Sequence, residues 1–283
     1  MSSRIFRNSL GSLVAAILSL TLFHNAAVAE SASERVNRTG VIRCGYAVWP
    51  GLVEKDPNTQ QLSGMFVEYM QELARAAELT VEWTGEYGWG DFIEALHTGK
   101  IDAMCAGIWT NAVRGKRVLF STPMAFQSIV PVVRVDDARF DSDIQKVNDP
   151  AVKIVVADGE SALTIATTDF PLASLHSLPQ RTDAGVMLAN VTHRKGDVTF
   201  VDLFTAMDFQ AKNPNKIKIV PTKFPVRVFG ITIAVGKNDA ALKSTFDAAT
   251  EQLLWTGRID QLLKRNEKLP GSYLQVSLPF AVE

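Results

Sequence analysis

The sequence predicts an α/β fold with a mainly parallel sheet covered by helices, and three observations support this prediction. Short apolar runs at 41–48, 79–83 and 101–108 have the length of buried strands. Between these runs, apolar residues recur at helical spacing over 65–79 and 92–96, and a glycine follows the second series. Strands that alternate with helices favour parallel pairing, because each helix returns the chain to the same edge of the sheet.

A second series of elements is expected after Pro123, in the same alternating style. Strands are predicted at 129–135, 152–157, 178–181, 197–201, 217–221 and 230–235. Helices are predicted from Ser161 and at 184–191, 202–210, 240–254 and 259–264. The polar segment before Gly40 carries no predicted element, and the tail at 270–283 has no clear periodicity, so we expect the tail to be irregular.

The N-terminal 29 residues have the three parts of a secretory signal peptide. Arg4 and Arg7 precede an apolar run at 13–23, and the small residues at 27–29 fit a cleavage site. The run is shorter than the ~20 residues that a membrane-spanning helix needs. We therefore expect an exported, freely diffusing periplasmic protein whose mature chain starts at Glu30.

Charge and cysteine content narrow the function classes. The chain has 29 Lys and Arg against 30 Asp and Glu, with the basic residues dispersed, so no electrostatic footprint for nucleic acid is expected. Cys44 and Cys105 are its two cysteines, each inside an apolar run. Export permits a disulfide between them, but two buried free thiols are the plainer interpretation of the pattern.

One basic residue lies where an α/β sheet places ligands. The run at 101–108 contains Gly107 and is followed by a polar loop with Arg114, and ligands bind beyond the carboxyl ends of such strands. Arg114 is therefore a candidate ligand contact. The alternative is a solvated basic turn that Arg114 forms with Lys116 and Arg117, and the spacing favours neither.

The order of these segments resembles that of the family 3 extracellular solute-binding proteins, the periplasmic receptors of polar amino acid ABC importers. Arg114 stands six residues before Phe120-Ser121, where that family has an arginine ahead of a Phe-Ser-x-Pro motif. Asp197 and Asp202 resemble its paired aspartates, five residues apart. The longest matching stretches are GMFVEYMQELARAAEL, WGDFIEALHTGKIDAMCAGI and FGITIAVGKNDAALKSTFDAATEQLLWTGRIDQLLKR.

The resemblance implies a two-lobe periplasmic binding protein fold (type II), with a ligand cleft between lobes that two hinge-crossing strands join. It also implies capture of a small polar solute, an amino acid or related carboxylate, for an ABC permease in the inner membrane, by a monomer without cofactor or metal. The implied division is a signal peptide at 1–29, lobe 1 from 30–127 and 229–283, and the hinge and lobe 2 from 128–228.

The resemblance also assigns roles to single residues. Arg114 would hold a ligand carboxylate through a bidentate contact, aided by backbone amides near Gly159 and Ser161 at a helix start. Asp202 would hold an ammonium group, although a helix N-cap is the plainer interpretation of its position. Trp49 is expected to face the cleft, whereas Trp89 is expected to be structural. The candidate ligand-binding residues are Trp49, Gly107, Trp109, Thr110, Arg114, Gly159, Glu160, Ser161 and Asp202.

Two residues of the site depart from the family pattern. Asn111 stands where the family usually has threonine, and Glu160 replaces a small residue beside the expected carboxylate site. Glu160 would repel a ligand carboxylate unless it points to solvent or pairs with a basic ligand group. The identity of the ligand is therefore open.

Two other functions compete with transport. The chain could be an exported dehydratase of this fold acting on a small cyclic carboxylate, with Glu160 as a general acid whose pKa is raised by burial. It has no nucleophile motif and no metal-ligand spacing, so we expect no enzyme. A ligand-sensing partner of a membrane receptor is the third possibility, which the sequence does not separate from transport.

Overall fold

The computed structural model describes residues 30–180, 182–267 and 269–277 of the chain. The predicted signal peptide at 1–29 lies outside these residues. None of the described helices is both long and apolar enough to span a bilayer. The helices are α2 (Ala32–Thr39), α3 (Met65–Ala76), α4 (Phe92–His97), α5 (Ala112–Gly115), the 3-10 helix η1 (Ile144–Val147), α6 (Ser161–Asp169), α7 (Ala184–Thr192), α8 (Leu203–Lys212), α9 (Ala240–Trp255) and α10 (Arg258–Asn266).

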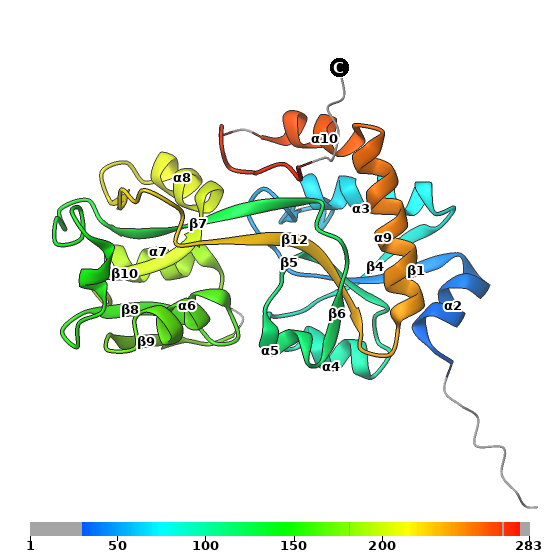
Figure 1. The fold of residues 1–283 in the computed structure, drawn as a ribbon, viewed down its shortest axis with the longest axis horizontal. Helices are drawn as coiled ribbons and strands as arrows, with labels where there is room; N and C mark the ends of the chain where they lie inside the picture. The colour runs from blue at the N-terminus through cyan, green and yellow to red at the C-terminus, as the bar shows by residue number, and fades with distance from the viewer. Residues whose placement is uncertain (1–29, 181, 268, 278–283) are drawn as a thin grey trace, which may run out of the picture. The chain divides into compact units, whose positions relative to one another are not determined.

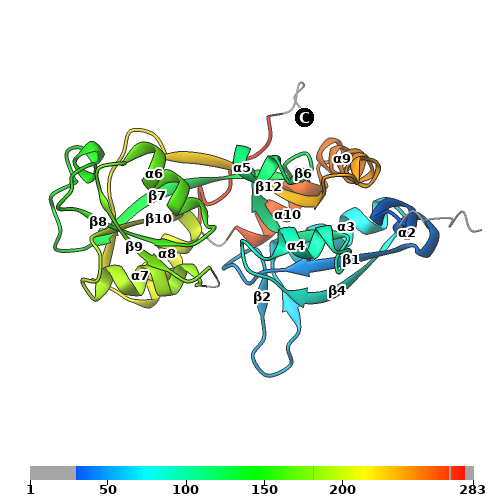
Figure 2. The same ribbon diagram turned by 90° about the horizontal axis from the view of Figure 1, so that it is seen from below.

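Eight strands form the main path of one mixed sheet, and Figures 1 and 2 show β7 and β12 side by side within it. In sheet order they are β4 (Thr80–Glu86), β1 (Val41–Tyr46), β5 (Ala103–Trp109), β12 (Arg227–Gly236), β7 (Ala125–Arg134), β10 (Val198–Asp202), β8 (Lys153–Ala157) and β9 (Ser174–Leu178). Two short strands and one separate pair lie off this path: β6 (Val118–Phe120) on β12, β11 (Ile217–Ile219) on β7, and β2 (Glu54–Lys55) with β3 (Leu62–Ser63).

The expectation of a mainly parallel sheet is wrong for the middle of this sheet. The pairs β4–β1, β1–β5, β10–β8 and β8–β9 are parallel, as strand–helix alternation predicts. The long strands β7 and β12 pair antiparallel with each other and with their neighbours β10 and β5. These two strands lead the chain from one parallel group to the other, so no helical crossover fixes their direction.

Most periodic segments form the expected elements, with one omission and one error that have clear physical reasons. Helix α2 lies in the polar segment before Gly40, which carried no predicted element, and a capping box starts it: Ser31 accepts from the Glu34 amide, and Glu34 accepts from the Ser31 amide. The strand expected at 178–181 lies instead at 174–178. Its side chains are mostly exposed, so no apolar alternation marks its position.

Helix α3 shows how an apolar stripe builds the core. Phe66, Met70 and Leu73 are fully buried at helical spacing, and Tyr69 between them donates to or accepts from Thr250 of α9 over 2.6 Å. Each such side chain stabilises the fold by about 1.5–3 kcal/mol through burial.

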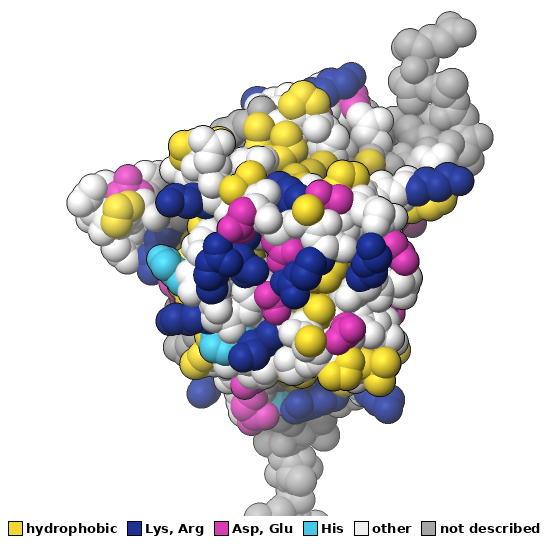
Figure 3. All heavy atoms as spheres, turned by 90° about the vertical axis from the view of Figure 1, so that its left-hand side faces the viewer, with side chains coloured by type: hydrophobic (Ala, Val, Ile, Leu, Met, Phe, Trp, Pro, Cys, Tyr) yellow, Lys and Arg dark blue, Asp and Glu magenta, His cyan; other side chains and the backbone are white. Residues whose placement is uncertain are grey.

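The surface carries mixed charge: Figure 3 shows Lys and Arg interspersed with Asp and Glu on one face.

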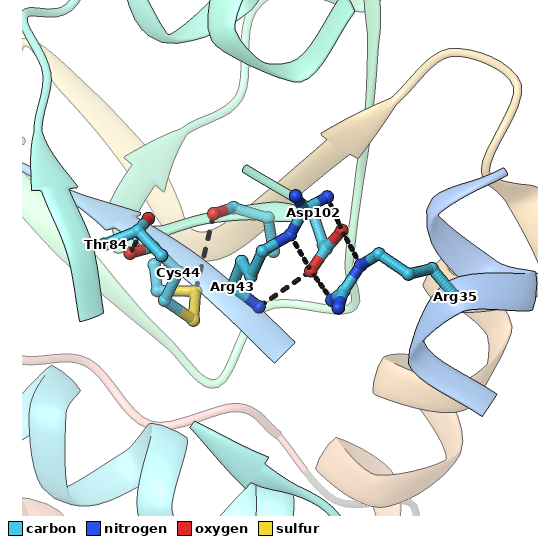
Figure 4. Close-up of a disulfide and its surroundings, with 7 residues drawn as sticks. Arg35, Arg43, Cys44, Thr84 and Asp102 are labelled. Atoms are coloured by element: carbon cyan, nitrogen blue, oxygen red, sulfur yellow. Dashed lines mark hydrogen bonds and ion pairs between the residues drawn. A yellow bond between two sulfur atoms is a disulfide. The ribbon is translucent and has the colours of Figure 1, made fainter. Parts of the chain in front are cut away.

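Cys44 and Cys105 form a disulfide, so the favoured interpretation as two free thiols is wrong (Figure 4). Strands β1 and β5 are parallel neighbours, which brings the two Cα atoms within 5.6 Å. Beside the bridge, the fully buried Asp102 pairs with Arg35 of α2 and with Arg43 of β1, where the Arg43 distance is 2.8 Å. The disulfide and this ion pair tie β1 to the start of β5.

The disulfide closes a loop between residues 61 positions apart, so its removal should destabilise the protein. We expect the variant Cys44→Ala/Cys105→Ala to lose about 2–4 kcal/mol of unfolding free energy, because the unfolded chain gains entropy. Urea denaturation measures this loss. Reductant should lower the midpoint of the native protein and leave the double variant unchanged, and an equal midpoint for native protein with and without reductant would contradict the prediction.

Candidate ligand-binding site

A small cavity of about 20 Å³ lies where four strands end. The loops after β1 and β4, the end of β5 and the turn after β8 surround it, as expected for a site beyond the carboxyl ends of parallel strands. The cavity is lined by Trp49, Leu52, Trp89, Gly107, Trp109, Arg114, Glu160 and Ser161. Six of the nine sequence-predicted residues are therefore on it.

Arg114 is buried on this cavity, with 7% of its surface exposed, so the alternative interpretation as a solvated basic turn is wrong. It lies in the short helix α5, which Asn111 caps by accepting from the Arg114 amide over 2.8 Å. Asparagine and threonine are both good N-caps, so the departure at Asn111 keeps this turn intact. The Arg114 side chain is buried, whereas Lys116 and Arg117 in the same loop are exposed.

The Arg114 guanidinium has carbonyl oxygens as its hydrogen-bond acceptors. Its Nη1 donates to Trp109 O over 3.4 Å, and its Nη2 donates to Trp89 O over 3.4 Å and to Gly159 O over 2.5 Å. No ion pair involves it within the described residues. Burial lowers the pKa of Arg114, and the Glu160 carboxylate opposes that effect. The cavity thus holds a desolvated cation that lacks a carboxylate in direct contact.

Glu160 points inward, which excludes the solvent-facing orientation. It is 5% exposed, precedes α6 as its N-cap, and accepts from the Ala162 amide over 2.5 Å. Burial raises the pKa of Glu160 to about 7, with a further increase from the nearby Asp202, while Arg114 and the helix amides lower it. At neutral pH this carboxyl group is therefore partly protonated.

Asp202 is fully buried and does not line the cavity. It is the N-cap of α8: its Oδ1 accepts from the Thr205 amide over 2.9 Å, and its Oδ2 accepts from the Thr205 hydroxyl over 2.7 Å. The same Oδ2 accepts from Trp49 Nε1 over 3.0 Å. The N-cap interpretation is confirmed, and contact between Asp202 and a ligand ammonium stays a prediction.

Three indoles form the aromatic walls. The Trp49 ring lies 5.3 Å from that of Trp89 and 5.5 Å from that of Trp109, edge to face in both cases. Trp109 also stacks on Phe229 and donates from Nε1 to Gln127 over 2.9 Å. Trp49 lines the cavity, as expected. Trp89 was expected only to pack structurally, but it lines the cavity as well.

Of the remaining predicted residues, Gly107 lines the cavity, whereas Gly159 and Thr110 do not. Gly107 has a φ of +73°, and a Cβ there would meet the Leu52 side chain at 2.8 Å, so glycine is required. Gly159 contributes its carbonyl to Arg114 but does not line the cavity, and neither does Thr110. Sequence reasoning missed Leu52, although its place beside Trp49 in the loop after β1 was a usable signal. No cluster of three or more metal-ligating side chains occurs among the described residues.

The raised pKa of Glu160 predicts a pH-dependent stability. Between its ordinary pKa of 4.5 and about 7, the folded protein keeps a proton that the unfolded chain has lost, so the unfolding free energy falls as pH rises through this window. Compared with Glu160→Gln, the native protein should lose on the order of 3 kcal/mol between pH 4.5 and 7.5.

Denaturant titrations at a series of pH values measure this difference. The matched control is Glu94→Gln, which changes an exposed carboxylate on α4 and should leave the pH profile of the native protein unaltered. Parallel profiles for native protein and Glu160→Gln would show that Glu160 titrates normally.

Comparisons with known proteins agree with this architecture. Three similar structures are the ancestral amino acid-binding protein AncCDT-1, a precursor of cyclohexadienyl dehydratase (23% identity, TM-score 0.71), a mutant of ArgBP from T. maritima (22%, 0.69), and the ABC transporter substrate-binding protein AbpA from Streptococcus pneumoniae Canada MDR_19A bound to L-arginine (19%, 0.71). Each match covers 83% of this chain and 98% of the other. These likenesses show the predicted two-lobe type II fold.

A search of curated proteins gives no match to the chain. The sequence model of one family does match, and it covers residues 42–266, most of the chain. The protein therefore belongs to the bacterial extracellular solute-binding proteins, family 3.

Proposed function

We propose that this protein is the periplasmic substrate-binding component of an ABC importer, and that it binds a small polar carboxylate, an amino acid or a related compound, at Arg114. The buried guanidinium carries the proposal. A charge removed from water is costly unless a countercharge is close, and Arg114 has no carboxylate in direct contact within the described residues. A ligand carboxylate would supply the missing charge.

The hydrogen bonds that Arg114 makes to carbonyl oxygens are weak enough for a ligand carboxylate to replace them. Two of its three contacts to carbonyl oxygens are 3.4 Å long, beyond the usual range for N–H···O bonds. A carboxylate that replaced them would form two shorter, charge-assisted bonds with the planar fork of the guanidinium. Ser161 lies beside this position at the first turn of α6, where the helix dipole favours an anion.

The size of the cavity requires a conformational change on binding. About 20 Å³ is room for one or two water molecules and not for an amino acid. We assign 30–127 and 229–283 to one lobe and 128–228 to the other, with β7 and β12 as the hinge strands. The bonds from Arg114 to Gly159 and from Trp49 to Asp202 join these two segments, so opening of the cleft would break both.

An amino acid ligand and delivery to a permease are supported by the family and by its relatives. AbpA has the same fold and was crystallised bound to L-arginine. The apolar N-terminal run supports export to the periplasm, and the protein would act there as a monomer until it meets the permease.

Glu160 favours one alternative function. A buried carboxyl group with a pKa of about 7, facing a cavity that also holds Arg114, is suited to protonate a leaving group. A dehydratase acting on a small cyclic carboxylate would use it in that way. Turnover of prephenate or arogenate by native protein, lost in Glu160→Gln, would establish that activity, and the absence of turnover would leave the binding function.

Replacement of Arg114 tests the proposed function. We expect Arg114→Ala to weaken carboxylate binding by 100-fold or more, because two charge-assisted hydrogen bonds contribute about 1.5–3 kcal/mol each. The unfolding free energy should change by no more than about 1 kcal/mol, since the loss of three hydrogen bonds to carbonyl oxygens is offset by removal of a buried charge.

Calorimetry against a panel of amino acids and organic acids measures the affinity, after copurified ligand has been removed by unfolding and refolding. Arg117→Ala is the matched control, because Arg117 is exposed in the same loop. If native protein bound no carboxylate, or Arg114→Ala kept full affinity, the proposal would fail.

A further inference from the structure

We infer that residues 269–277, which follow the last helix, form a strap that stabilises the closed cleft, and that Tyr273 of this strap helps to set ligand affinity from outside the cavity. This inference rests on the proposed function, because it concerns the two lobes that close on the ligand. It is drawn from an aromatic contact between the strap and α8 of the other lobe.

The strap is fastened to lobe 1, and Figure 1 shows it in red beside β7. Leu274 exchanges two backbone hydrogen bonds of 2.8 Å with Phe126, at the start of that strand. The Gly271 amide donates to the side chain of Glu267, the residue after α10, over 2.8 Å. These bonds fix the backbone of the strap relative to β7 and α10.

Tyr273 reaches from the strap to lobe 2. Its ring stacks on that of Phe204 in α8, with the centroids 6.2 Å apart, and the two residues are only 6% and 3% exposed. Gly51, in the loop after β1, lies against both rings. A Cβ at Gly51 would come within 2.8 Å of Tyr273 Oη and within 2.9 Å of Phe204 Cε1. Phe204 of lobe 2 therefore packs against two separate segments of lobe 1.

This contact lies on the cleft side of the hinge strands. Phe204 follows Asp202 by two residues, and Gly51 follows Trp49 by two. The bond from Trp49 Nε1 to Asp202 Oδ2, 3.0 Å long, joins the two lobes across the cleft. Opening of the cleft would break that bond and expose both rings of the contact to water. Because exposure of buried aromatic surface is unfavourable, the contact favours the closed state.

A contact that favours closure strengthens the binding of every ligand. Closure also removes Arg114 and Glu160 from water, which is costly until a ligand is bound, so we expect the closed state to be the minor one without ligand. The apparent affinity is then the intrinsic affinity multiplied by the closed fraction. Tyr273 does not line the cavity, so it changes that fraction and not the choice among ligands.

The ring of Tyr273, and not its hydroxyl, makes this contact. Its Oη is buried and has no hydrogen-bond partner in the part of the chain that the structure describes. Removal of a buried hydroxyl without a partner costs no hydrogen bond. Tyr273→Phe therefore keeps the contact and is the conservative variant against which Tyr273→Ala is compared.

Calorimetry on strap variants tests the inference. The probes are the twenty standard amino acids, succinate and malate, and each probe that native protein binds is measured with every variant. We expect Tyr273→Ala to weaken the binding of each such probe by about tenfold, with the same factor for all of them. Tyr273→Phe should bind at least as tightly as native protein. Leu274→Ala is the matched control, because Leu274 is 39% exposed on the same strap and its backbone bonds to Phe126 remain.

A variant in α8 removes the same contact from the other lobe. Phe204→Leu should weaken binding by a similar factor, and it provides a second test if Tyr273→Ala does not fold. The double variant Phe204→Leu/Tyr273→Ala should lose little more affinity than the weaker-binding single variant, because both substitutions remove one shared contact.

The outcomes separate the inference from the proposed function. Unchanged or tighter binding in Tyr273→Ala or Phe204→Leu, a loss confined to some probes, or an equal loss in Tyr273→Phe would each overturn the inference and leave carboxylate binding at Arg114 in place. Failure of native protein to bind any carboxylate in the panel would overturn the proposed function itself.

Discussion

The buried guanidinium of Arg114 constrains the whole cleft, because an arginine cannot lose its charge and must be held among acceptors. Asn111 caps the short helix that carries Arg114, and the carbonyls of Trp89, Trp109 and Gly159 lie around the guanidinium. Those three residues follow β4, end β5 and follow β8, so the ends of three strands converge on one cation. Two of these hydrogen bonds are long, so the solvation of the cation by neutral oxygens stays incomplete, which is why we propose an anion as the ligand.

Trp49 connects this cation to the other polar groups of the cleft. Its ring contacts the two other indoles of the cavity, and its N–H bonds Asp202, which in turn caps α8. Glu160 adds a second buried carboxyl group near Arg114, and its raised pKa reflects the cost of keeping two acids and one cation out of water.

The sequence predicted those parts that local periodicity or order along the chain encodes. The stripe of α3 and the strand before Arg114 were predictable, and Trp49, Glu160 and Ser161 were found through their position in a recognisable order of segments. The bridge between Cys44 and Cys105 was not, because it depends on β1 and β5 being neighbours. The inward orientation of Glu160 and the position of Trp89 on the cavity depend on the directions of side chains in loops. Hydrophobic periodicity in the sequence does not encode these directions. The antiparallel pairing of β7 and β12 was not predicted, because strands alternate with helices only within each parallel group.

Identification of the compound that the protein carries from its own cell tests the central claim most directly. The protein would be purified without refolding, the bound small molecule released by denaturation, and its mass and fragmentation determined, with Arg114→Ala prepared in parallel as the control. The account predicts a compound with a carboxylate that is present at near-stoichiometric amount in native protein and absent from the variant. A stoichiometric ligand without any carboxylate, or one retained by Arg114→Ala, would contradict it.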